Sequence, residues 1–238
     1  MKILGIDTTG QTASAAIIDG DKLLAEISQN HGLTHSQTIM PIIAEICRQT
    51  ETDLKDIDYI ACAAGPGSFT GLRIGAATAK GLCLGTGKKL IPVPTLDALA
   101  YDIYMTDKIV CPIMDARRGQ VYGALYQWEE ERLVPLTEAM AVPIEEMISI
   151  ANSFEQDVIF LGDGVPVHRE KLEKYPAFHF APAHCSLQRG AAVAALGGIL
   201  AEEGKAVSGD AFSLIYLRKS QAEREREERL MEKGDAHV

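Results

Sequence analysis

The stretch that decides the fold is residues 59–84, which read YIACAAGPGSFTGLRIGAATAKGLCL. Residues 60–64 are a short apolar run, typical of a strand that is covered on both faces. The segment 65–67, Gly-Pro-Gly, ends this strand, because glycine permits positive φ and proline removes a backbone donor. Ser68 or Thr70 can then cap a helix that continues to about residue 84. The stretch therefore predicts strand, turn and helix, the unit of an α/β fold.

The predicted helix has one unusual face. Gly71, Gly75, Ala79 and Cys83 are spaced by four, so they form a ridge with almost no side chain on it. Glycine inside a helix costs about 0.5–1 kcal/mol relative to alanine, and close approach of another backbone would offset that cost. From the residues alone, three interpretations stay open. The ridge packs against the chain's own sheet or a neighbouring helix, it contacts a second protein, or the helix start holds a phosphate.

Length and composition set the class of protein. The chain has 238 residues, of which 47% are hydrophobic, which suits one large or two modest domains. No window approaches the roughly 18–20 apolar residues that a membrane span needs, and the N-terminus lacks the apolar stretch of a signal peptide. The five cysteines show no CxxC spacing, so we expect reduced, buried thiols. These features predict a soluble, cytoplasmic protein with no membrane contact.

The charge balance argues against one class of partner. The formal net charge is −10, whereas a protein that holds nucleic acid by itself usually presents a basic face to the phosphates. We therefore expect any contact with nucleic acid to be indirect, through a partner protein.

A pattern of strand, aspartate, Gly-Gln turn and returning strand occurs twice. The first copy has Asp7 after strand 2–6, and the second has Asp115 after strand 109–114, 108 positions further on. This spacing equals a plausible domain size and predicts two similar lobes. The predicted division is a first lobe at 1–106, a second, smaller lobe at 107–220 with helices near 143–152, 167–174 and 186–203, and a charged C-terminal helix or tail at 221–238.

An ordered series of motifs resembles the TsaB family. The series consists of Asp7-Thr8-Thr9, His35-Ser36, GPGSFTGLRIG at 65–75, Asp115-Ala116-Arg117 with Gly119 and Val121-Tyr122, and Tyr216-Leu217-Arg218. It covers nearly the whole chain, and GPGSFTGLRIG is its specific element. The resemblance implies the ASKHA fold of the actin and hexokinase superfamily, with two α/β lobes that each have a mixed sheet and flanking helices.

The resemblance also implies a role without independent catalysis. TsaB-like proteins bind and activate a TsaD-like transferase, which carries the metal and the chemistry, and a TsaE-like ATPase joins the pair. Together they transfer a threonylcarbamoyl group to an adenosine of tRNA. When alone, a TsaB-like protein is expected to form a homodimer. The implied partner interface lies on the helices at 35–49 and 70–84, and the expected contact residues are Ile39, Ile42, Ile46, Gly71, Ile74, Gly75, Thr78, Ala79 and Leu82.

Three catalytic alternatives have weaker support. Asp7, Thr8, Thr9 and Gly10, with Asp115 and the glycines Gly162 and Gly164, form half of an ASKHA nucleotide site. We interpret it as vestigial, with no tightly bound cofactor and at most weak or interface-dependent ATP or ADP binding. The alternative that this half-site leaves open is a stand-alone ATP-dependent phosphotransferase.

His31 and His35 have the spacing of a metal-binding HxxxH motif, but Gly32 and Thr34 predict a loop there, so no metal site is expected. Ser68 at a strand–helix turn lacks the G-x-S-x-G pattern of a hydrolase nucleophile and has no evident histidine base, so capping is its expected role.

Overall fold

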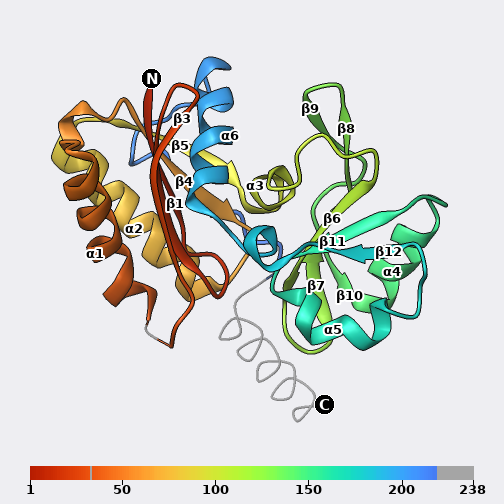
Figure 1. Cartoon of the computed structure of the whole chain (residues 1–238). Coiled ribbons are helices and arrows are strands. Elements are labelled where there is room, and N and C mark those ends of the chain that lie inside the picture. The colour runs from red at the N-terminus through yellow and green to blue at the C-terminus, as the bar shows by residue number, and fades with distance from the viewer. Residues whose placement is uncertain (33, 219–238) are drawn as a thin grey trace, which may run out of the picture.

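Two α/β lobes lie side by side in the computed structural model, which describes residues 1–32 and 34–218 (Figure 1). The first lobe is built on a five-stranded sheet with the order β3-β2-β1-β4-β5. Strands β1, β2 and β3 form an antiparallel meander, and β4 and β5 add to it in parallel. The bounds of the five strands are β1 (Lys2–Asp7), β2 (Ala13–Asp19), β3 (Lys22–Gln29), β4 (Tyr59–Gly65) and β5 (Lys89–Pro94).

Helices cover both faces of this first sheet. Helices α1 (His35–Thr50) and α2 (Phe69–Thr86) lie on the outer face, and α3 (Thr95–Tyr101) and α6 (Gly190–Glu202) lie on the face toward the second lobe (Figure 1). The expectation that β4 is covered on both faces is confirmed, because all but the first of its residues are buried.

The second lobe has a seven-stranded sheet. Its main order is β10-β7-β6-β11-β12, and β8 and β9 form a hairpin attached to β6. Strand β6 has an antiparallel neighbour in β7 and a parallel one in β11, as β1 has in β2 and β4. The bounds are β6 (Ile109–Asp115), β7 (Gln120–Gly123), β8 (Tyr126–Glu129), β9 (Arg132–Pro135), β10 (Met140–Pro143), α4 (Ile144–Asn152), β11 (Val158–Leu161), α5 (Gly164–Leu172) and β12 (Phe178–Phe180).

The structure corrects the assignment of the last predicted helix. We predicted a helix at 186–203 within the second lobe, whereas α6 packs on β1, β2, β4 and β5 of the first sheet. Small residues allow this contact: a Cβ added at Gly190 would lie 2.6 Å from the backbone of Ala15, and one at Gly5 would lie 2.2 Å from the carbonyl oxygen of Gly190. The predicted boundary at 107–220 is therefore wrong for this helix, because sequence position does not reveal which sheet a crossing helix covers.

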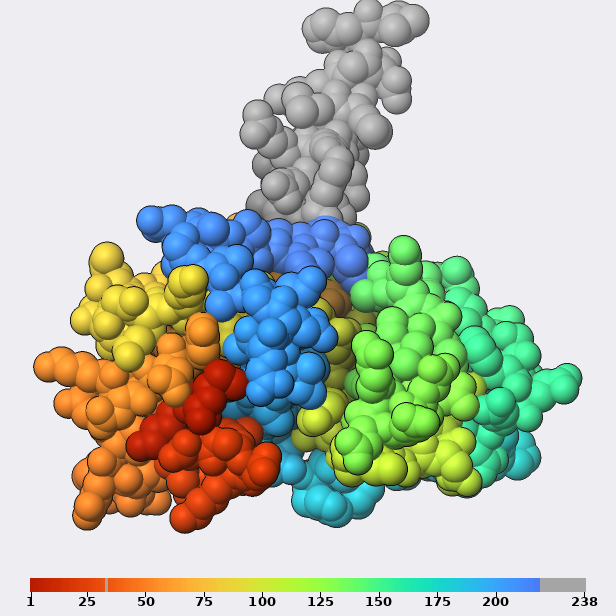
Figure 2. Space-filling view, turned by 90° about the horizontal axis from the view of Figure 1, so that it is seen from above, coloured from red at the N-terminus to blue at the C-terminus, as the bar shows by residue number. Residues whose placement is uncertain are grey.

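The last described segment, residues 205–218, connects the two lobes. Phe212 is buried in the core of the first lobe, and Leu217 packs in the cluster at the lobe junction. The amide of Ile215 donates to the carbonyl of Ala64 at 2.7 Å, and the Arg218 guanidinium donates to the carbonyl of Ala116 at 2.7 Å. Figure 2 shows this segment in blue along one edge of the molecule, running from the first lobe to the second. The predicted charged tail at 221–238 lies outside the described residues.

In the described part of the chain, no helix is both long and apolar enough to cross a membrane.

Candidate functional site

The turn between β4 and α2 is held by the loop that follows β1. Gly65 has φ +117°, a conformation that suits glycine. The Ser68 side chain accepts a hydrogen bond from the Gly71 amide at 3.3 Å, so the prediction that Ser68 caps the helix is confirmed. The Ser68 amide in turn donates to the carbonyl of Thr9 at 2.8 Å. The start of α2 is thus capped by its own serine and tied to the loop after β1 by the amide of the same residue.

The glycine–alanine ridge of α2 faces the chain's own sheet. A Cβ added at Gly71 would lie 2.0 Å from the carbonyl oxygen of Thr8, and one at Gly75 would lie 2.6 Å from the Thr8 hydroxyl. Ala79 and Cys83 continue the ridge and are buried. Of the alternatives that the spacing left open, packing against the chain's own sheet is the one observed. The ridge lets α2 approach β1 closely, and it offers no surface to a second protein.

Most of the predicted interface residues are therefore buried within the lobe. Ile74 and Thr78 are the half-buried members of the predicted set, and they lie at the edge of the helix. The buried members, for which the interface prediction is wrong, are Ile39, Ile42, Ile46, Gly71, Gly75, Ala79 and Leu82. The physical reason is that the isoleucines of α1 and the small residues of α2 form the stripes that cover the sheet.

The opposite side of α2 is the surface that the helix exposes. Ala77, Gly81 and Gly85 are exposed and also spaced by four, and Leu84 is 89% exposed. Apart from the adjoining residues and backbone of the helix itself, no atom of the described residues lies within 4 Å of the position that a Cβ would take at Gly81 or Gly85. Arg73 continues this side toward the start of the helix.

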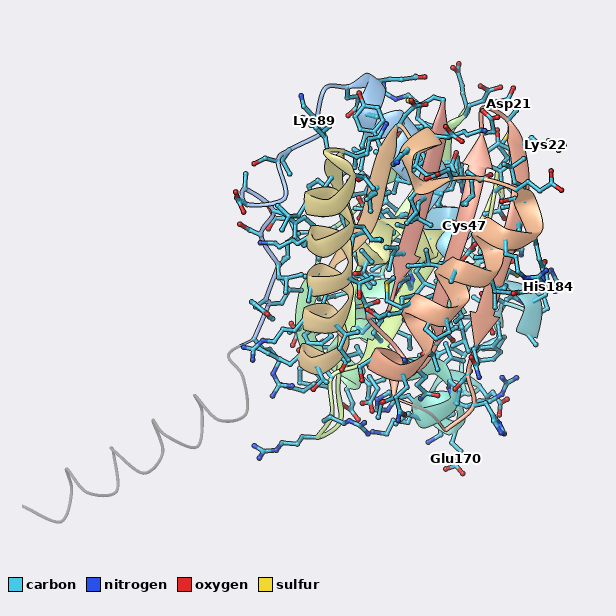
Figure 3. The ribbon with its side chains drawn as sticks, turned by 90° about the vertical axis from the view of Figure 1, so that its left-hand side faces the viewer. Asp21, Lys22, Cys47, Lys89, Glu170 and His184 are labelled. Carbon is cyan, nitrogen blue, oxygen red and sulfur yellow. The ribbon has the colours of Figure 1, made fainter. Side chains whose placement is uncertain are left out.

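Helix α1 lies beside α2 and adds to the exposed surface, as Figure 3 shows by facing both helices. Met40 is 43% exposed, and Pro41 and Ala44 are also exposed. We call this surface the α1–α2 face and define it by Met40, Pro41, Ala44, Arg73, Ala77, Gly81, Leu84 and Gly85. The sequence contains the signal for it, because Ala77, Gly81 and Gly85 form a second small-residue row on the same helix.

The first predicted phosphate loop has its polar groups bonded internally. The Asp7 carboxylate accepts from the amide and the hydroxyl of Thr9, at 2.8 and 2.7 Å. The Thr8 hydroxyl donates to the carbonyl of Gly71 at 2.8 Å. Asp7 is 1% exposed, and its burial raises the pKa of the carboxyl from 3.8 to about 6. The side-chain amide of Gln188 packs against Gly10, where an added Cβ would lie 2.4 Å from the amide nitrogen.

The residues of the second half of the predicted nucleotide site also pack within the chain. Cβ atoms added at Gly162 and Gly164 would lie 2.1 and 3.0 Å from the carbonyl oxygen of Ile113. These glycines therefore allow a close approach between β6 and the loop after β11. The Asp115 amide donates to the Asp163 carboxylate at 3.1 Å, and burial raises the pKa of Asp163. The structure does bring β6 near the loop after β1, since a Cβ added at Gly67 would lie 2.7 Å from the carbonyl oxygen of Thr9 and 3.3 Å from the Met114 side chain.

The predicted HxxxH pair is not arranged around a metal ion. A ring nitrogen of His35 lies 2.8 Å from the carbonyl oxygen of Gly10, so this side chain ties the start of α1 to the loop after β1. Within the ranges that the structure describes, no group of three or more histidine, cysteine or acidic side chains is arranged to hold a metal.

Comparisons with known proteins establish the family. The family model described as "TsaD: tRNA N6-adenosine threonylcarbamoyltransferase" matches residues 23–225. The "tRNA threonylcarbamoyladenosine biosynthesis protein TsaB" of Bacillus subtilis is 32% identical over 173 residues, which cover 73% of this chain and 76% of that protein. The chain belongs to the TsaB family. The Escherichia coli TsaB is 36% identical over 150 residues, which cover 62% of this chain and 64% of the relative.

The fold of this TsaB-family chain also matches a solved structure. "YeaZ from Pseudomonas aeruginosa" superposes with a TM-score of 0.79 at 22% identity, covering 91% of this chain and 99% of the other. The mixed α/β ASKHA-like fold predicted from the sequence is confirmed.

Proposed function

We propose that this chain is a non-catalytic partner protein in the synthesis of threonylcarbamoyladenosine in tRNA. In this role it binds a TsaD-like threonylcarbamoyltransferase and helps to keep that enzyme in its active form. A TsaE-like ATPase joins the complex. When the transferase is absent, the same surface pairs with a second copy of the chain.

The observation that carries the proposal is the α1–α2 face. Leu84 is 89% exposed beside Gly81 and Ala77, and Met40 is exposed on the adjacent helix. A flat, largely apolar surface formed by two helices suits contact with another protein, because small residues let a partner helix approach closely and the larger apolar side chains lose water on binding. Ile74 and Thr78, at the edge of this face, are the residues of the original interface prediction that fit the proposal.

The phosphate loops support a role without catalysis. The carboxylate of Asp7 and the hydroxyls of Thr8 and Thr9 are already hydrogen-bonded within the chain, and all three residues are 1% exposed. A nucleotide would have to displace these bonds. We therefore propose that the chain alone holds no nucleotide tightly, and that any ATP or ADP binding is weak or depends on the interface with the partner.

The proposal is tested by substituting Gly81→Arg and measuring binding to the purified TsaD-like transferase by calorimetry. The new side chain meets open space in the free chain and replaces glycine in a helix, so the fold should be as stable as the wild type or slightly more stable. Binding should be lost. Ser149→Arg places the same side chain on the exposed surface of α4 in the second lobe and should bind as the wild type does.

Two results would contradict the proposal. One is wild-type affinity of Gly81→Arg for the transferase. The other is ATP turnover by the isolated chain that Asp7→Asn abolishes, which would support a stand-alone ATP-dependent phosphotransferase instead.

A further inference from the structure

We propose that a patch of arginine and aromatic side chains beside the α1–α2 face contacts RNA directly. The patch consists of Phe69, Arg73, Arg117, Arg118, Tyr216 and Arg218, and we call it the arginine–aromatic patch. The inference depends on the proposed role in tRNA modification for the identity of the RNA, whereas the contact itself is argued from the chemistry of the patch. It revises the expectation that tRNA is met only through a partner.

The aromatic part of the patch is a stacked pair of rings. The rings of Phe69 and Tyr216 have centroids 4.5 Å apart and planes 12° from parallel. The Arg73 guanidinium lies 5.7 Å from the Phe69 centroid. Tyr216 is 42% exposed, and Phe69 stacks on one face of its ring. In the proposed contact an unpaired base stacks on the opposite face. Stacking on an exposed tyrosine is a common way to bind unpaired bases of RNA.

Four arginines lie on the segments that carry or adjoin this stack. Arg117 and Arg118 lie in the turn between β6 and β7, and the Arg117 side chain is 87% exposed. The Arg218 guanidinium donates to the carbonyl of Ala116 at 2.7 Å, which places this turn beside the segment that carries Tyr216. Four arginines therefore gather in one region of a chain whose net charge is −10.

In the described part of the chain, the acidic groups that contact this turn are largely covered. Asp115 lies 3.4 Å from the Arg117 guanidinium, but its side chain is 15% exposed. Asp163 contacts the Asp115 amide and is 7% exposed. The exposed charge of the patch is therefore positive, which complements the phosphates of a nucleic acid.

The backbone conformation of the two arginines does not favour arginine, so the stability of the turn does not explain these residues. Arg117 and Arg118 have φ values of +65° and +56°, and Gly119 follows at +74°. The left-handed region disfavours residues with a long side chain, and glycine or asparagine is the usual choice in such hairpin turns. Arginine at both positions makes a role in binding the better explanation.

The test is fluorescence anisotropy with a labelled RNA stem-loop that has unpaired bases in its loop, using the full chain alone and in complex with the TsaD-like transferase. Tyr216→Ala should weaken binding by about five- to 150-fold, because it removes one base stack. The double substitution Arg117→Gln and Arg118→Gln should weaken binding and lower the slope of log affinity against log salt by about one and a half. Tyr216→Phe keeps the ring and should bind as the wild type does. Arg132→Gln, on the exposed hairpin strand β9, is the matched control for charge.

Unchanged affinity in both Tyr216→Ala and the double arginine variant would overturn the inference, as would equal competition by a polyglutamate peptide, which would indicate an acidic protein as the partner. The double variant keeps the outcome interpretable if Tyr216→Ala fails to fold, because Arg117 and Arg118 are on the surface. Tyr216→Ala and the double arginine variant, which leave the α1–α2 face intact, should still bind the transferase with near wild-type affinity. Loss of RNA binding with retained transferase binding separates this inference from the proposed function.

Discussion

Two glycines of α2 should respond in opposite ways to the same substitution. At Gly71 a new Cβ would lie 2.0 Å from the carbonyl oxygen of Thr8, whereas at Gly81 no described atom outside the adjoining turns of the helix lies within 4 Å. Alanine gains about 0.5–1 kcal/mol over glycine in a helix, so Gly81→Ala should raise the free energy of unfolding by that amount. Overpacking against fixed backbone costs about 1–3 kcal/mol or more. After the helix gain is subtracted, we expect Gly71→Ala to lower the free energy of unfolding by about 2 kcal/mol.

The assay is urea denaturation followed by circular dichroism on both variants and the wild type. A loss of about 2 kcal/mol should lower the urea midpoint by roughly 0.5–1 M, and the slope of the transition should stay unchanged. Equal or greater stability of Gly71→Ala would refute the conclusion that α2 lies directly against the loop after β1.

Two further predictions concern buried charges in the first lobe. The Asp7 pKa is near 3.8 in the unfolded chain and about 6 in the folded one, so the folded state holds an extra proton between these values and wild-type stability falls as the pH rises through that window. Relative to the wild type, Asp7→Asn should therefore gain stability from pH 4 to pH 7, by at most about 3 kcal/mol. Urea titrations at several pH values measure the difference in unfolding free energy between the two proteins, and a difference that does not change with pH would contradict the prediction. Glu26 pairs with Arg189 and also accepts from the amide of Ala191, so Glu26→Gln should cost about 1–2 kcal/mol of unfolding free energy. Glu45→Gln, at an exposed ion pair on α1, is the control that should change little, and an equal effect of the two substitutions would show that the Glu26 pair is as weak as a surface one.

The local structure around residue 65 could be predicted from the sequence because each signal there acts over a few residues. The apolar run before Gly65, the helix cap at Ser68 and the small residues at spacing four all correspond to observed features. The pairing of β6 with β7 and β11, which matches that of β1 with β2 and β4, was likewise signalled by the repeated aspartate and Gly-Gln pattern.

The partner that the α2 ridge faces and the sheet that α6 covers could not be predicted in the same way. The spacing of Gly71, Gly75 and Ala79 indicates that another backbone approaches α2 closely. The same pattern fits a sheet of the same chain and a helix of a second protein. Helix α6 was assigned to the wrong lobe, since its glycines and alanines fit any flat partner and the choice of sheet depends on Gly5 and Ala15, far away in sequence. The arginine–aromatic patch was missed because Phe69, Arg117 and Tyr216 meet only in the folded chain.

The most direct test of the central claim is protection of the α1–α2 face by the transferase. Leu84→Cys in a Cys47→Ser background provides a single reactive thiol, because the other four native cysteines are buried. The thiol at position 84 should be alkylated rapidly when the chain is alone and dilute, and at least about tenfold more slowly when the TsaD-like transferase is bound. As a control, the thiol of Arg132→Cys in the same background should stay reactive in the complex. An unchanged rate at Leu84→Cys in a complex shown by light scattering to be fully formed would mean that the transferase binds elsewhere.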